Sequence, residues 1–231
     1  MELINSFCDS APMAETILSE NQQNVLESVS RDAMLCQNFY LTGGTALAEY
    51  YLHHRLSEDL DFFSEQEVDT QAVAAFFAKN KAHLGIREMD FQQSFNRNLF
   101  FVSLGEDVIK TEFTYFPFPR IEQKLKKNEL FIDSLEDIAA NKLFTIYQKP
   151  RSRDFIDLYL ILQKTSQTLD DLIKKTTMKF DWHIDYLQLG SQFLLAETVK
   201  DYPRMLIDLN PSAWQKFFLD QAKSFREKIL E

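Results

Sequence analysis

The stretch NFYLTGGTALAEYYLHHRLSEDLDFFS, residues 38–64, decides the fold of this chain. Its first apolar residues, 39–41, predict a short strand, and Gly43 and Gly44 end that strand just before Thr45 can begin a helix. The chain contains only five glycines, so two in succession indicate a sharp turn or a close approach of another group to the backbone. Backbone amides at the start of a helix can bind an anion, and phosphate is the natural candidate.

Two aspartates follow the expected helix. Residues 59–63, DLDFF, alternate between polar and apolar and predict a second strand beside the first. Asp59 and Asp61 then share one face, about 7 Å apart along the strand, while Leu60 and Phe62 face the core. Two carboxylates held together repel each other, and a divalent cation removes the repulsion. The pair therefore predicts magnesium and phosphoryl-transfer chemistry.

Two segments of this stretch resemble the nucleotidyltransferase toxins of the abortive-infection E type (AbiEii/AbiGii), and more distantly the polymerase-beta-like superfamily. They are residues 43–48, GGTALA, and residues 54–63, HRLSEDLDFF. The order and spacing of the glycine pair, the arginine, the serine and the aspartates make the match specific; the structural alternative is a tight turn followed by a solvated strand face. By this resemblance, the residues that bind the nucleotide include Gly43, Gly44, Thr45, Arg55 and Ser57.

The middle of the chain predicts three more strands, at 86–95, 99–104 and 108–116, with turns at 96–98 and 105–107. Lys110 and Glu112 share one face of the last strand. The polymerase-beta-like resemblance implies a third acid on a later strand, which makes Glu112 the candidate third metal ligand beside the two aspartates. An exposed cross-strand ion pair is the alternative reading of Glu112.

Beyond Pro117 and Pro119 the periodicity of the apolar residues is helical only. We therefore expect a domain boundary there. Residues 1–118 would form a nucleotidyltransferase domain with a mixed sheet and flanking helices, and residues 119–231 a helical domain that closes the nucleotide cleft. The fold class is α+β.

A buried charge stands out in the helical part. The helix expected over 152–162 is apolar almost all round, so Asp157 must be paired, and Arg153 or Lys142 could be its partner. The Lys142 ammonium could also extend into water or into the cleft. Residues 137–143, DIAANKL, and 153–159, RDFIDLY, resemble the later motifs of the same family. The resemblance implies that Lys142 contacts the triphosphate, that Asp157 holds the site in place and that Arg153 binds the nucleotide; the alternative is a purely structural ion pair.

Composition narrows the function further. A net charge of −10 argues against sequence-blind binding of nucleic acid over the whole surface. No stretch of about 18 apolar residues is present to cross a membrane, and the first residues lack a secretion signal, so we expect a cytoplasmic protein. Cys8 and Cys36 are isolated thiols for which we expect no disulfide partner.

The function predicted from these features is a magnesium-dependent nucleotidyltransferase. Two magnesium ions held by Asp59, Asp61 and Glu112 would assist transfer of a nucleoside monophosphate from a nucleoside triphosphate to a hydroxyl. The family resemblance implies an RNA acceptor, such as a tRNA end, and a toxin paired with a cognate antitoxin in phage defence. One alternative is transfer to a small molecule or a protein hydroxyl. Another is a catalytically weak protein that binds a nucleotide or a partner.

Overall fold

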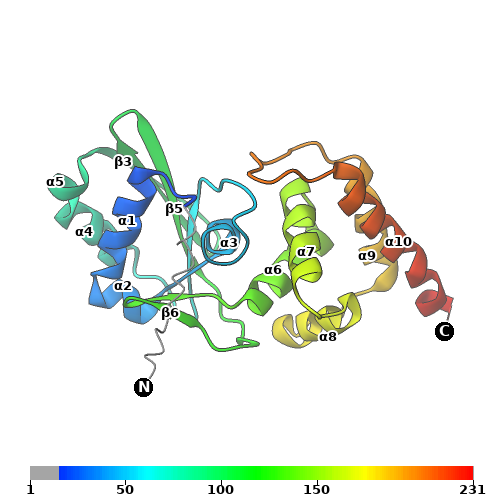
Figure 1. The fold of residues 1–231 in the computed structure, drawn as a ribbon. Coiled ribbons are helices and arrows are strands. Elements are labelled where there is room, and N and C mark those ends of the chain that lie inside the picture. The colour runs from blue at the N-terminus through cyan, green and yellow to red at the C-terminus, as the bar shows by residue number, and fades with distance from the viewer. Residues whose placement is uncertain (1–15, 231) are drawn as a thin grey trace, which may run out of the picture.

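The computed structural model describes residues 16–230, and Figure 1 shows a sheet with its helices beside a second, purely helical region. The predicted α+β fold, with a mixed sheet followed by a helical region, is confirmed. The spacing of apolar residues over 14–36 predicts one amphipathic helix before the first strand; its expected start lies outside the described residues, as does Cys8. None of the described helices is both long and apolar enough to cross a membrane.

Within residues 16–230, seven strands form one sheet in the order β3-β4-β5-β2-β1-β7-β6. The strands are β1 (Tyr40–Thr42), β2 (Leu60–Ser64), β3 (Ile86–Ser94), β4 (Arg97–Leu104), β5 (Asp107–Tyr115), β6 (Leu125–Lys127) and β7 (Leu130–Ile132). Strand β2 pairs antiparallel with β1 and parallel with β5, which makes the sheet mixed. The predicted antiparallel meander of β3, β4 and β5 is confirmed.

The first turn of the meander differs from the prediction. It consists of Phe95 and Asn96, and Ser94 pairs with Arg97 across it. Phe95 has a φ of 55°, a left-handed conformation that allows a two-residue turn. Arg97 therefore lies on β4 and not in the turn, which brings its side chain to the face of the sheet that carries Glu112.

The prediction that only helices follow residue 119 is wrong. Strands β6 and β7 form a hairpin there, and β7 pairs parallel with β1. Each strand has three residues, and β6 reads Leu-Lys-Lys, which is too short and too charged to show a strand pattern. The boundary between residues 118 and 119 stays a prediction, although the sheet extends to Ile132.

Five short helices accompany the sheet within the described residues: α1 (Glu20–Ser30), α2 (Ala33–Asn38), α3 (Gly43–Leu47), α4 (Thr70–Lys79) and α5 (Lys81–Leu84). The single helix expected up to Cys36 is divided into α1 and α2, because the Asp32 side chain caps a new helix by accepting a hydrogen bond from Leu35 N. Helix α3 continues as a π-helical turn, Ala48–Leu52, which ends at His53 with a φ of 49°.

Polar and apolar side chains alternate along β2, and they lie on the two faces of the strand as predicted. Leu60 and Phe62 are fully buried, and the Phe62 ring stacks on Phe113 of β5 with 5.0 Å between ring centres. This apolar face fixes the register of the strand, because a shift by one residue would bring the aspartates into the core. Asp59 and Asp61 therefore point to the opposite side.

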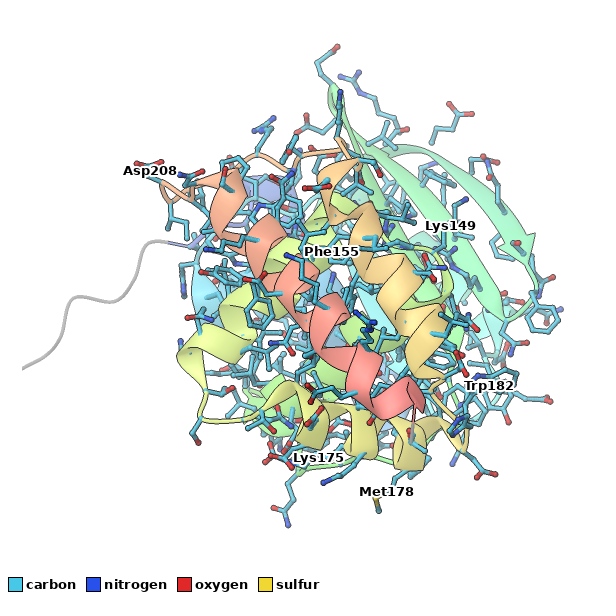
Figure 2. The ribbon with its side chains drawn as sticks, turned by 90° about the vertical axis from the view of Figure 1, so that its right-hand side faces the viewer. Lys149, Phe155, Lys175, Met178, Trp182 and Asp208 are labelled. Carbon is cyan, nitrogen blue, oxygen red and sulfur yellow. The ribbon has the colours of Figure 1, made fainter. Side chains whose placement is uncertain are left out.

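The helical region contains α6 (Leu135–Gln148), α7 (Ser152–Lys164), α8 (Leu169–Phe180), α9 (Tyr186–Leu194), a 3-10 turn (Leu195–Glu197) and α10 (Pro211–Leu230). Figure 2 looks onto this region from the side, with Phe155 of α7 labelled behind α9 and α10. The Phe155 ring contacts Trp214 and Phe218 of α10, with ring centres 5.9 and 4.8 Å away. This aromatic packing holds α7, which carries Asp157, against the other helices.

Candidate active site

A cleft of about 810 Å³ lies between the sheet and the helical region. Its walls come from the β1–α3 turn, β2, β4, β5, α6, the start of α7 and the loop before α10. Most of the predicted site residues line it: Gly43, Gly44, Arg55, Ser57, Asp59, Asp61, Glu112, Lys142 and Arg153. Thr45 and Asp157 do not line it, because both are fully buried behind its wall.

The glycine pair lets other side chains of the site approach the backbone. A Cβ atom on Gly43 would overlap the Asp61 carboxylate, and Gly43 has a φ of 71°, which disfavours other residues. A Cβ atom on Gly44 would overlap the Arg55 guanidinium and lie 3.0 Å from Ser57 Oγ. The close approach that the sequence predicted is confirmed, and the approaching groups belong to the protein itself.

Asp59 and Asp61 have different surroundings. Asp59 Oδ2 accepts a hydrogen bond from Lys110 Nζ at 2.7 Å, and the Thr45 hydroxyl donates to the Asp59 carbonyl oxygen. Burial, together with the nearby charges of Glu112 and Asp59, raises the pKa of Asp61 to about 6, against a weaker opposing effect of Lys110. Asp61 is thus a carboxylate whose charge the protein leaves poorly compensated.

Glu112 is held by neutral and cationic donors. Arg97 Nε donates to Oε1 at 2.6 Å and Arg97 Nη2 donates to Oε2, while the Thr114 hydroxyl also donates to Oε1, at 2.7 Å. Burial alone would raise the pKa of Glu112, but Arg97 and Thr114 bring it below its usual value. Among residues 16–230, no three His, Cys, Asp or Glu side chains are arranged to hold a metal ion. Glu112 as third metal ligand stays a prediction.

Asp157 lies at the centre of a buried network. Its Oδ1 accepts from Arg55 Nε at 2.7 Å and lies 2.8 Å from His54 Nε2, and its Oδ2 accepts from Arg55 Nη2 at 2.8 Å. Lys142 Nζ is 2.6 Å from Oδ2. Burial would raise the pKa of Asp157, but Lys142 and Arg55 hold it well below its usual value. The predicted pairing with Lys142 is confirmed, and the partner expected as an alternative, Arg153, is not used.

One expectation about the cations needs correction. The Lys142 side chain does not keep its ammonium in water, because it is largely buried and pairs with Asp154 at 2.9 Å as well as with Asp157. Arg55 is buried too, and its Nη1 donates to the Leu56 carbonyl at 2.9 Å. These pairs join segments that lie far apart in the sequence. No local pattern could therefore have revealed His54 or Arg55 as partners of Asp157.

The loop of residues 201–207, here called the strap, closes one end of the cleft. Leu56 N donates to the Arg204 carbonyl at 2.8 Å, and Leu206 N donates to the His54 carbonyl at 2.9 Å. Asp201 Oδ1 accepts from Ser152 N, which ties the other end of the strap to α7. Figure 1 shows this loop, in orange before α10, extending toward the segment that precedes β2. The strap has no periodic sequence signal, and sequence reasoning missed it.

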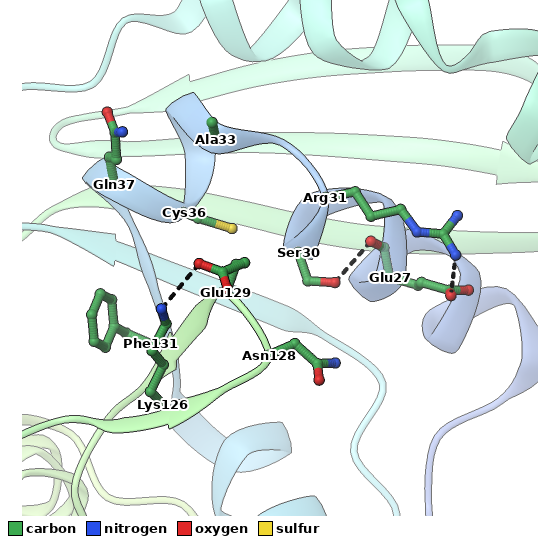
Figure 3. A pocket seen from close by; sticks show the side chains of 10 residues that line it. All are labelled: Glu27, Ser30, Arg31, Ala33, Cys36, Gln37, Lys126, Asn128, Glu129 and Phe131. Atoms are coloured by element: carbon green, nitrogen blue, oxygen red, sulfur yellow. Dashed lines mark hydrogen bonds and ion pairs between the residues drawn. The ribbon is translucent and has the colours of Figure 1, made fainter.

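A second hollow lies between α1, α2 and the β6–β7 hairpin, as Figure 3 shows. Its charged side chains pair with each other: Lys126 with Glu129 at 3.0 Å, and Arg31 with Glu27. Burial and the Asp32 charge raise the pKa of the Cys36 thiol, so it stays protonated. This hollow offers no unpaired charge and no activated nucleophile.

Paired carboxylates on a strand of a mixed sheet, beside a glycine turn and facing a lysine-bearing helix, are the arrangement expected of a nucleotidyltransferase. Comparison with known proteins agrees, since residues 25–228 match the family described as nucleotidyl transferase AbiEii toxin of type IV toxin-antitoxin systems. The chain belongs to this AbiEii family.

Individual relatives extend over nearly the whole chain. An uncharacterized protein of Aquifex aeolicus (strain VF5) is 30% identical over 217 residues, which are 91% of this chain and 98% of that protein. The crystal structure of JHP933 from Helicobacter pylori is 18% identical, with a TM-score of 0.55 over 92% of this chain and 97% of that one. MenT4, a nucleotidyltransferase toxin from Mycobacterium tuberculosis, is 18% identical, with a TM-score of 0.55 over 87% and 82%. The two structures support the fold.

Proposed function

We propose that this protein transfers a nucleoside monophosphate from a nucleoside triphosphate to an acceptor hydroxyl with the help of magnesium. The observation that carries the proposal is Asp61, a carboxylate beside Asp59 and Glu112 in a cleft, with a pKa raised to about 6. A carboxylate with a strongly perturbed pKa in a cleft more often serves a function than the stability of the fold.

The residues present fit a divalent cation at Asp59 and Asp61. Both carboxylates line the cleft, and neither oxygen of Asp61 has a cationic hydrogen-bond partner among the described residues. Magnesium bound there would neutralise the two acids and polarise a phosphoryl oxygen. Glu112 would join as a third ligand through a carboxylate that also accepts from Arg97.

The remaining residues position the reacting groups. In the transfer, the acceptor oxygen forms a bond to the α-phosphorus, the bond to the β-phosphate oxygen breaks, pyrophosphate leaves and the hydroxyl proton passes to a carboxylate or to water. Gly43 and Gly44 would bring their backbone close to the phosphates, with Ser57 beside them. Lys142 and Arg153 would contact the triphosphate, and the buried Arg55–Asp157 pair would hold the wall behind it.

The family suggests which acceptor and which partner to test. Membership in a type IV toxin-antitoxin family supports a toxic activity that a cognate antitoxin controls, with RNA, including tRNA ends, as the acceptor to test first. The overall charge of −10 confines any RNA contact to local sites such as this cleft, where Arg97, Arg151 and Arg204 reach the surface.

The experiment is incubation with magnesium, total RNA and each of the four nucleoside triphosphates labelled on the α-phosphate. Label in RNA is expected from the wild type and not from Asp61→Asn. Label in a small molecule or protein instead would keep the transfer and reject the RNA acceptor. Bound nucleotide without any transfer would reject the enzymatic function.

A further inference from the structure

A triphosphate in the cleft needs cationic partners, because charge-assisted hydrogen bonds from arginine and lysine are the strong contacts that phosphates make. Most cations of the cleft already serve carboxylates of the protein. Each of the following pairs lies within 3 Å: Arg55–Asp157, Arg97–Glu112, Lys110–Asp59, Lys142–Asp157 and Arg151–Asp154. The charge of these cations is therefore already partly balanced by a carboxylate of the protein.

Two arginines of the cleft are not paired with a carboxylate within the described residues. Of the lysines and arginines that line it within the described residues, Arg153 and Arg204 are those whose side chains make no hydrogen bond or ion pair. Arg153 follows the first residue of α7, and Arg204 lies in the strap. Resemblance to the family already suggested Arg153 as a nucleotide contact, whereas nothing in the sequence pointed to Arg204.

The strap holds Arg204 close to the expected phosphate site. The Arg204 carbonyl oxygen accepts a hydrogen bond from Leu56 N at 2.8 Å. Ser57, which follows Leu56, has its hydroxyl against Gly44. The Arg204 side chain is exposed and lines the cleft. The main chain makes the bond to Leu56, so the guanidinium stays available while its backbone is fixed.

We propose that Arg204 binds the β- and γ-phosphates of the incoming nucleotide, in the place that the sequence suggested for Arg55. This inference rests on the proposed function and names a further binding residue for it. Arg55 instead supports the wall through Asp157. Because the strap belongs to the helical region, the triphosphate would then bridge both walls of the cleft and hold them together.

The test compares Arg204→Gln with Arg226→Gln, an exposed arginine of α10 that does not line the cleft. Binding of inorganic tripolyphosphate and of each nucleoside triphosphate is measured by calorimetry with magnesium. Arg204→Gln should weaken all of them by a similar factor, about ten- to hundredfold, since the lost contact is to phosphate. Arg204→Lys should recover part of the affinity, and Arg226→Gln should match the wild type.

Unchanged affinity of Arg204→Gln for tripolyphosphate would overturn the inference. Thermal unfolding checks that the variant keeps its fold, which is expected because the exposed side chain makes no hydrogen bond or ion pair within residues 16–230. A wild type that binds tripolyphosphate through Arg204 but transfers no label would reject the proposed function and leave this inference in place.

Discussion

Replacement of Asp157 by alanine tests whether the buried network is structural, functional or both. The side chain is fully buried and touches Arg55, Lys142 and His54. Its removal leaves the buried Arg55 without a carboxylate and leaves Lys142 with Asp154 alone. Breaking a buried ion pair in this way costs about 3–5 kcal/mol. For a protein of this size the melting temperature should fall by roughly 6–20 °C.

The matched control is Asp137→Ala. Asp137 is equally buried and pairs with Lys179 at 2.6 Å, but it lies outside the cleft. Both variants should lose stability in urea and thermal unfolding, and only Asp157→Ala should also lose nucleotide affinity. The reasoning is refuted if Asp157→Ala unfolds within about 1 kcal/mol of the wild type, or if it binds nucleotide as tightly as Asp137→Ala does.

The pH dependence of the same variant gives a second check. The folded pKa of Asp157 lies well below its usual value, so its carboxylate stabilises the folded state above about pH 4, the unfolded pKa. That contribution is lost as the pH falls toward the folded pKa. The stability difference between wild type and Asp157→Ala should therefore be constant from pH 5 to 7 and shrink below about pH 4. A difference that grows on acidification would contradict the paired carboxylate.

Three further outcomes are expected. Asp61 has a folded pKa of about 6, above its unfolded value near 4, so the metal-free protein should lose stability as the pH rises between these values. Asp61→Asn should abolish transfer yet be about 3 kcal/mol more stable than wild type at pH 7.5, as unfolding at pH 5 and 7.5 will show. Gly43→Ala should destabilise the protein more than Gly105→Ala does, because both glycines have a positive φ but only Gly43 has a carboxylate against it. Equal melting temperatures of the two variants would argue against that contact. Lys142→Ala should lower the free energy of unfolding by about 1–3 kcal/mol and should also weaken nucleotide binding. Strictly additive effects with Asp157→Ala in a double-mutant cycle would mean that the two side chains do not interact.

Local patterns predicted much of the sheet and part of the site. The alternation in residues 59–63 identified β2 and the face of its aspartates, and turn residues identified the meander. The same kind of reasoning missed β6 and β7, where three residues per strand leave no period to detect. It placed Arg97 in a turn, since a phenylalanine in a left-handed conformation is rarely expected.

The arrangement of the site depends on contacts between distant segments. The apolar helix around Asp157 made it foreseeable that this buried carboxylate needs a partner. That Arg55 and His54 are the partners depends on how α7 packs against the sheet region. Thr45 was expected at the phosphates, yet it is buried with its hydroxyl on the Asp59 carbonyl, which gives it a role in fixing the strand. Burial and pairing across the cleft appear only in three dimensions.

The strap has a consequence for synthesis of the protein. A ribosome makes the glycine turn, both aspartates, Glu112 and Lys142 well before it makes residues 201–207, which bond back to His54 and Leu56. Contacts between such distant segments form late, because a long loop must close first. No nascent or truncated chain that stops before Asp201 has a complete cleft. A fragment from interrupted translation would therefore lack Arg204 and the main-chain bonds that join the strap to His54 and Leu56.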